Sequence, residues 1–138
     1  MGDAKDTGMN KYKLLKWARS LALYLFWPAM AVLIWSELDP APPNLEDYVW
    51  DKALHFIAYF ILSGIACVAL KADRRVVAAT LGVIVLGGVM EVLQGFTGRD
   101  PSFYDEVANA LGAICGAGAG WLLIRQLRPK ILASSGHH

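Results

Sequence analysis

Eight polar side chains interrupt the apolar parts of this sequence, and their types are those that bind anions, move protons or hold metal ions. They lie at the starts and ends of apolar segments: Asp51, Lys52, His55, Glu91, Gln94, Arg99, Asp105 and Asn109. A bilayer makes such residues costly, so several of them gathered at one end of a helix bundle indicate a functional site. Whether they meet depends on the elements that carry them.

The composition is that of an integral membrane protein. Of 138 residues, 56% are hydrophobic and only 18% are charged, whereas a soluble domain carries about a quarter charged residues. The apolar residues are concentrated in four runs, at 17–36, 52–70, 76–95 and 104–124. Each run is close to the ~20 residues that cross a bilayer as a helix. The sequence therefore predicts an all-α integral membrane protein with a bundle of four transmembrane helices.

The domain organisation follows from these runs. We predict a cytoplasmic N-terminal segment at 1–16, the membrane domain at 17–128, and a cytoplasmic tail at 129–138 that ends in a tag-like sequence. The first run is long, contains Trp27 and Pro28, and lacks a small-residue cleavage site. It is therefore interpreted as a retained transmembrane helix, with a kink expected at Pro28, rather than as a signal peptide.

The distribution of basic residues predicts the orientation. Eleven of the thirteen lie before or at the start of the first run, in the second link or after the fourth run. Four crossings place these three regions on one side, so the positive-inside rule puts both termini in the cytoplasm. The ends that carry the polar residues then face the periplasm or the exterior.

Helical spacing predicts that the polar residues share inward faces. Residues four apart lie on one side of a helix, which gives three stripes: His55, Tyr59 and Ser63; Gly87, Glu91 and Gln94; Asp105, Asn109, Gly112 and Gly116. Polar faces of membrane helices turn away from lipid. Gly112, Gly116 and Gly120 also form a small-residue repeat that allows another helix to approach closely.

Several of these residues also have a purely structural interpretation. Asp51 and Asp105 could serve only as helix-start carboxylates, because Ser102 to Asp105 forms a capping-box pattern. Asn109 and Gln94 suit hydrogen bonds between helices, and His55 could be a bundle histidine.

Glu91 is the hardest of the polar residues to explain structurally. A carboxylate one or two turns inside the membrane must find a partner or take up a proton. Lys52, His55 and Arg99 are the candidate partners, and Arg99 could instead bind an anion.

The pattern of these residues resembles the VanZ-like membrane proteins. Residues 51–56 read D-K-x-x-H-F, residues 91–96 read E-x-x-Q-x-F, and Arg99, Asp105, Asn109 and Gly112 match R-x5-D-x3-N-x2-G. The similarity extends over about residues 50–116. It implies a multi-pass protein of the bacterial inner membrane. The family takes its name from a protein associated with resistance to the glycopeptide antibiotic teicoplanin, a property of that member.

Three functions fit the residues. In an enzyme, His55 would be the base, oriented by Asp51 or Asp105, and the desolvated Glu91 the acid; Lys52 and Arg99 would hold an anionic group. In a binding protein, the same groups with Gln94 and Asn109 would recognise an envelope lipid headgroup, a lipid-linked cell-wall precursor or a glycopeptide antibiotic target. In a structural protein, they would only fix the bundle.

The remaining expectations concern cofactors and partners. No cofactor and no metal site are predicted, because no strong metal motif is present, although the His and carboxylate types leave a divalent ion open. Membrane lipids are the expected partners, and a homo-oligomer is compatible with the sequence. No nucleic-acid motif is found.

Overall fold

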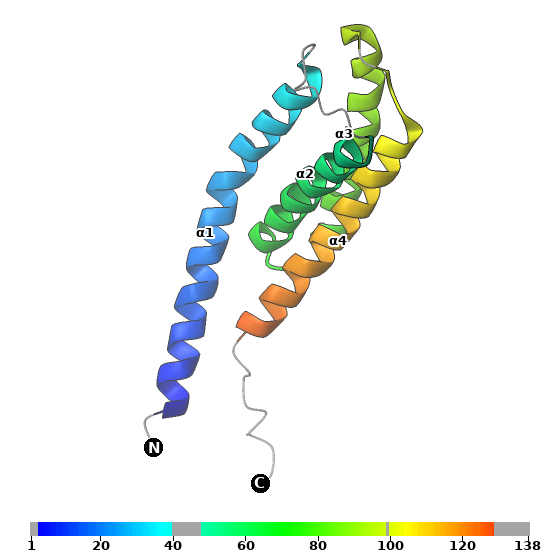
Figure 1. The fold of residues 1–138 in the computed structure, drawn as a ribbon. Coiled ribbons are helices and arrows are strands. Elements are labelled where there is room, and N and C mark those ends of the chain that lie inside the picture. Colours follow the sequence, from blue (N-terminus) through cyan, green and yellow to red (C-terminus); the bar gives the residue numbers. More distant parts are fainter. Residues whose placement is uncertain (1–2, 40–47, 99, 129–138) are drawn as a thin grey trace.

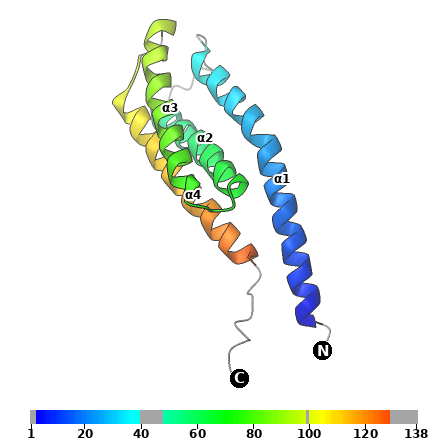
Figure 2. The ribbon, with the colours of Figure 1, turned by 180° about the vertical axis from the view of Figure 1, so that it is seen from behind.

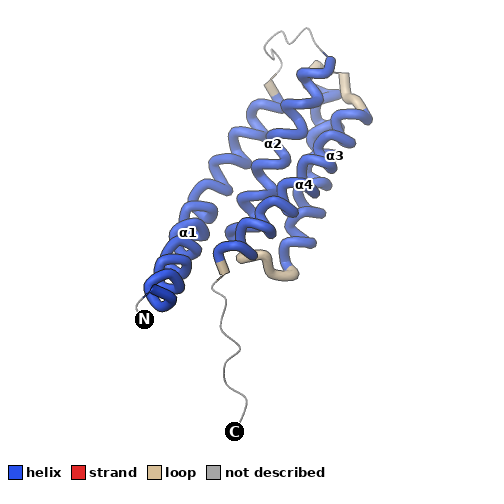
Figure 3. The backbone as a smooth tube through the Cα atoms, turned by 60° about the horizontal axis from the view of Figure 1, so that its bottom comes forward, coloured by secondary structure: helices blue, strands red, loops and turns tan. Residues whose placement is uncertain are grey.

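Four helices account for nearly all of the described chain, which confirms the predicted fold class. The computed structural model describes residues 3–39, 48–98 and 100–128. Within these ranges there is no strand, as Figure 3 shows. The helices are α1 (Asp3–Leu38), α2 (Tyr48–Ala69), α3 (Arg75–Thr97) and α4 (Phe103–Leu127). Each is long and apolar enough to cross a membrane.

The helices run alternately up and down, so the beginning of α1 and the end of α4 lie at the same end of the molecule (Figure 1). Helix α1 lies to one side of α2–α4, as the view from behind also shows (Figure 2). It begins at Asp3, well before the predicted start at residue 17, and continues through Pro28 as a single helix. The bounds of the other three helices are close to the predicted runs.

The closest helix contact is between α2 and α4, which run in the same direction. Gly112 and Gly116 lie directly against the backbone carbonyls of Phe56 and Phe60, and a Cβ at either glycine would overlap these oxygens. One turn farther on, a Cβ at Gly120 would come within 2.9 Å of the Cys67 side chain. The glycine repeat therefore does what its spacing predicts: it brings two helix backbones together.

Apolar side chains fill the bundle below its polar end. The larger buried cluster comprises Leu33, Tyr59, Leu62, Val83 and Ala113, one or two from each helix. At the polar end, where α1 and α3 finish and α2 and α4 begin, large aromatic side chains are exposed: Trp35, Phe96, Phe103 and Tyr104. Aromatic residues in this position are typical of a membrane–water interface.

The glycine contact can be tested with two variants on the same helix. Gly116→Ala places a methyl group against the Phe60 carbonyl, and we expect it to lower the free energy of unfolding by about 1–3 kcal/mol. Gly118→Ala is the control, since a Cβ there meets nothing within 4 Å. It should be neutral or stabilising by up to ~1 kcal/mol. Unfolding in mixed detergent micelles measures both, and equal effects would contradict the proposed contact.

Candidate polar site at the helix ends

Buried polar side chains from all four helices gather at the end of the bundle described above. We call this group the polar cluster; it consists of Glu37 from α1, Asp51, Lys52 and His55 from α2, Glu91 and Gln94 from α3, and Asp105 and Asn109 from α4. Apart from Asp51 and Lys52, every member is at most 8% exposed. Seven of the eight residues predicted from the sequence are therefore placed at this end of the bundle. The eighth, Arg99, lies outside the described residues.

Lys52 joins α2 to α4 through Asp105 and also contacts Asp51 of its own helix. Its Nζ forms an ion pair with Asp105 Oδ1 and lies 3.2 Å from Asp51 Oδ2. Asp105 is almost fully buried, whereas the Asp51 side chain is 31% exposed. Consequently the cluster reaches the surface at Asp51, and an anionic ligand of Lys52 would have to compete with both carboxylates.

Asp105 is not the partner in a capping box. Ser102 precedes α4 in an extended conformation, but neither side chain of the pattern makes a capping hydrogen bond. The Asp105 backbone N–H donates to the Ser102 carbonyl at 2.9 Å, while its carboxylate contacts Lys52. The structural interpretation of Asp105 as a cap is therefore wrong in this conformation.

His55 is held by Asn109 in one orientation. Its Nδ1 lies 3.1 Å from Asn109 Oδ1, and Asn109 Nδ2 donates to Glu106 Oε2 at 3.5 Å. Because a carboxylate accepts hydrogen bonds, the Asn109 amide nitrogen must face Glu106 and its oxygen must face the imidazole. We therefore assign the hydrogen to Nδ1. His55 Nε2 then faces Asp51 Oδ1 at 3.9 Å.

Glu37 is a member of the cluster that sequence reasoning missed. Its Oε2 accepts a hydrogen bond from the Tyr59 hydroxyl at 3.2 Å, and its Oε1 lies 3.6 Å from His55 Nδ1. Its backbone carbonyl accepts from Gln94 Nε2 at 3.1 Å. Glu37 thus attaches the end of α1 to α2 and α3. The available signal was its spacing of four from Leu33, which is also buried, but this spacing alone does not show which face of α1 turns inward.

Glu91 binds the start of α4. Its Oε2 accepts a hydrogen bond from the Ser102 backbone N–H at 3.0 Å, one of the unpaired donors at a helix N-terminus. Its Oε1 is buried and has no hydrogen-bond partner among the described residues. The expected partners Lys52 and His55 are engaged elsewhere.

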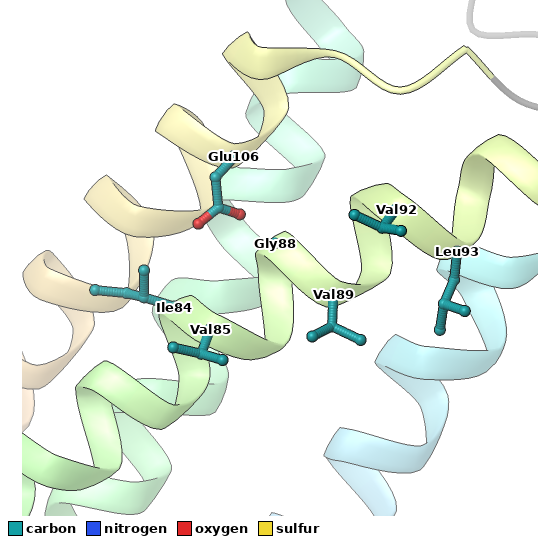
Figure 4. Close-up of a pocket in the computed structure, with 7 residues that line it drawn as sticks. All are labelled: Ile84, Val85, Gly88, Val89, Val92, Leu93 and Glu106. Carbon is teal, nitrogen blue, oxygen red and sulfur yellow. The ribbon is translucent and has the colours of Figure 1, made fainter.

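Glu106 connects the cluster to an open apolar pocket on the outside of the bundle. The pocket is lined by α3 residues and by Glu106: Ile84, Val85, Gly88, Val89, Val92, Leu93 and Glu106. Figure 4 shows the Glu106 side chain extending from α4 toward α3. A Cβ at Gly87 would lie 2.6 Å from its Oε2, so the glycine leaves room for this carboxylate. Through Asn109, Glu106 is linked to His55.

The arrangement brings a histidine and two carboxylates close enough to act together. One ligand atom from each of Asp51, His55 and Asp105 lies within 4.8 Å of the other two. The chain is therefore a four-span membrane protein with a buried Asp–His–Asp group in its polar cluster. Comparisons with protein-family models, curated proteins and solved structures gave no match.

A double-mutant cycle tests the central ion pair. Removing only one partner, with Lys52→Met or Asp105→Asn, leaves the other without its partner in a largely buried place, and each change should destabilise the fold by roughly 3 kcal/mol. The double variant should be more stable than the sum predicts, with a coupling of about 1–3 kcal/mol. Reversible unfolding in detergent measures these values.

The exposed pair Asp73–Arg75 supplies the control cycle. Arg75 Nε lies 3.2 Å from Asp73 Oδ2, but the Arg75 side chain is 76% exposed. Coupling there should stay below about 1 kcal/mol. Equal coupling in the two cycles would show that burial does not strengthen the Lys52–Asp105 pair.

Proposed function

We propose that this chain is a VanZ-like protein of the bacterial inner membrane whose polar cluster faces the periplasm or the exterior and binds the headgroup of an envelope lipid. The orientation is argued from the sequence: apart from Lys52 and Arg99, the basic residues lie in the segments assigned to the opposite side of the membrane. The family assignment rests on the sequence pattern at Asp51, Lys52, His55 and the matching positions of α3 and α4. The gathering of these residues at one end of the bundle supports it.

The observation that carries the proposal is the burial of more ionisable groups than the fold needs. Transferring a carboxylate out of water costs several kcal/mol even after relaxation. The glycine contact already fixes the register of α2 against α4. Yet Glu37, Glu91 and Asp105 are all at least nine-tenths buried around His55. A ligand that contacts these groups explains why so many ionisable side chains are buried despite the desolvation cost.

The contacts favour a headgroup that donates hydrogen bonds. Lys52 is already bound to two carboxylates, and Glu91 Oε1 is an acceptor without a described partner. Hydroxyl or ammonium groups, as in carbohydrate-bearing or amine-bearing lipids and lipid-linked cell-wall precursors, complement such acceptors. An anionic headgroup, which the residue types also suggest, would depend on Arg99 and on releasing Lys52.

Proton transfer is within reach of the same groups. With its hydrogen on Nδ1, His55 presents a lone pair at Nε2 and is suited to act as a base. Glu91 is the nearby candidate acid. Ser63 is not placed to act as a nucleophile beside the imidazole, because it lies two turns below His55 and contacts Thr80 at 3.5 Å.

The competing function is structural. Tyr59 and Gln94 bind Glu37, and Lys52 binds Asp105, so these contacts join all four helices. In that case the cluster would contribute only to stability and helix register.

Lipid retention separates the two functions. The protein, extracted in mild detergent and exposed to a panel of phospholipids and glycolipids, is analysed by native mass spectrometry. For His55→Gln and Glu91→Gln we expect about tenfold weaker retention of the preferred headgroup class, equal to losing ~1.4 kcal/mol of binding. Ser63→Ala is the control, a buried polar residue on the same face of α2.

Unfolding measurements on the same variants complete the test. Retention that falls only in proportion to lost stability, or equally in Ser63→Ala, would favour the structural function. Retention without any headgroup preference in the wild-type protein would refute the proposed binding.

A further inference from the structure

We propose that Asp51, His55 and Asp105 form a binding site for one divalent metal ion, with Lys52 as the built-in cation that the ion displaces. The site uses one imidazole nitrogen and two carboxylates, ligands that Zn²⁺ and Mn²⁺ accept. Asp51 and His55 are one helical turn apart on α2, and Asp105 comes from the neighbouring α4. The α2–α4 glycine contact therefore also sets the metal-binding geometry.

The distances are near those of a bound ion. Ligand atoms of the three residues lie within 4.8 Å of one another. Ligands at ~2.1 Å from a tetrahedral ion lie about 3.4 Å apart, so the farthest pair must approach by up to roughly 1.4 Å. Rotation of the Asp51 side chain, which is 31% exposed, can supply this movement without shifting a helix.

The orientation of His55 gives an independent reason to expect a cation. Asn109, fixed by Glu106, accepts the Nδ1 hydrogen, so in a neutral imidazole the Nε2 lone pair faces Asp51 Oδ1 at 3.9 Å. A cation between the two atoms, either a metal ion bound to Nε2 or a proton on Nε2, would satisfy both. Metal-bound histidines commonly donate their other ring N–H to a carbonyl or carboxylate in this manner.

Glu91 adds a second observation. Its Oε1 is buried without a hydrogen-bond partner among the described residues, and the carboxylate interacts electrostatically with Asp105 and His55. The site therefore has a third buried carboxyl group nearby, whose ionised form would favour a divalent ion over the single charge of Lys52.

Lys52 determines how the site can be tested. Its ammonium group contacts both carboxylate ligands, so it occupies the position of a cation and must move when a metal ion binds. Removing Lys52 should therefore increase metal affinity, whereas it would only weaken a purely structural cluster.

The metal site lies in the same cluster as the proposed lipid site. Metal binding itself does not depend on lipid binding, but the functional effect of a bound ion rests on the proposed function. An ion on Nε2 would prevent His55 from acting as a base and leave Glu91 as the candidate proton-transfer group. Ion binding itself can be measured without lipid. Lipid retention can likewise be measured after treatment with a chelator, so the two proposals fail separately.

Mn²⁺ titration of the chelator-treated protein, followed by electron paramagnetic resonance, tests the site. His137 and His138 at the tag-like end are first changed to Ala so that they cannot bind the ion. We expect one Mn²⁺ per chain, about tenfold tighter binding in Lys52→Met, and at least about tenfold weaker binding in Asp105→Asn and His55→Gln. Asp73→Asn, in the exposed ion pair, is the control and should bind like the parent.

Three results would overturn the metal site: no stoichiometric binding in the parent, undiminished binding in Asp105→Asn and His55→Gln, or no gain in a folded Lys52→Met. Where a variant does not fold, NMR of the parent provides the measurement. Mn²⁺ should broaden the imidazole signals of His55, the single histidine left after the tail changes. Unbroadened signals at saturating Mn²⁺ would show that a protonated imidazole, with no metal, satisfies Asp51.

Discussion

The backbone contact between α2 and α4 is the constraint on which the rest of the structure depends. Gly112 and Gly116 lie against the carbonyls of Phe56 and Phe60, and this fixes both the distance and the register of the two helices. In that register, Asp105 reaches Lys52 and Asn109 reaches His55. A larger residue at either glycine would separate the helices and all of these polar contacts at once. The apolar half of the bundle thus positions the chemistry of its polar end.

Burial makes the polar contacts both strong and mutually dependent. In a low-dielectric interior an unpaired polar atom is costly, so each member of the cluster must satisfy another. Glu106 orients Asn109, which in turn orients His55. Glu37 accepts from Tyr59 and offers its carbonyl to Gln94. Because α1 otherwise packs along one side of the bundle (Figure 1), these hydrogen bonds attach its polar end to α2 and α3.

The sequence was sufficient for the features that follow from periodicity and hydropathy. Apolar runs predicted four spanning helices, and the four-residue spacing of His55 and Tyr59 predicted their inward face. The sequence could not predict Glu37, because the inward face of α1 is set by its packing against the other helices. The sequence also could not assign the hydrogen-bond and ion-pair partners of the cluster residues. Lys52, His55 and Arg99 were the candidate partners of Glu91, and Asp105 was a candidate partner of His55. The relative height of α3 and α4 places one Glu91 carboxylate oxygen at the Ser102 N–H.

Both proposed ligands, the metal ion and the lipid headgroup, must change the contacts of Lys52 with its two carboxylates. Its ammonium group is the one described cation in contact with both Asp51 and Asp105. A metal ion or an ammonium-bearing headgroup must displace it from these carboxylates, whereas an anionic headgroup must draw it away from them. In each case the side chain moves, and the freed charge needs a new partner. At the start of α2, the Asp51 side chain is the most exposed member of the cluster. The Lys52 side chain can therefore move toward solvent on that side. Ligand binding at this site is therefore coupled to the position of a single lysine, whatever the chemistry of the ligand.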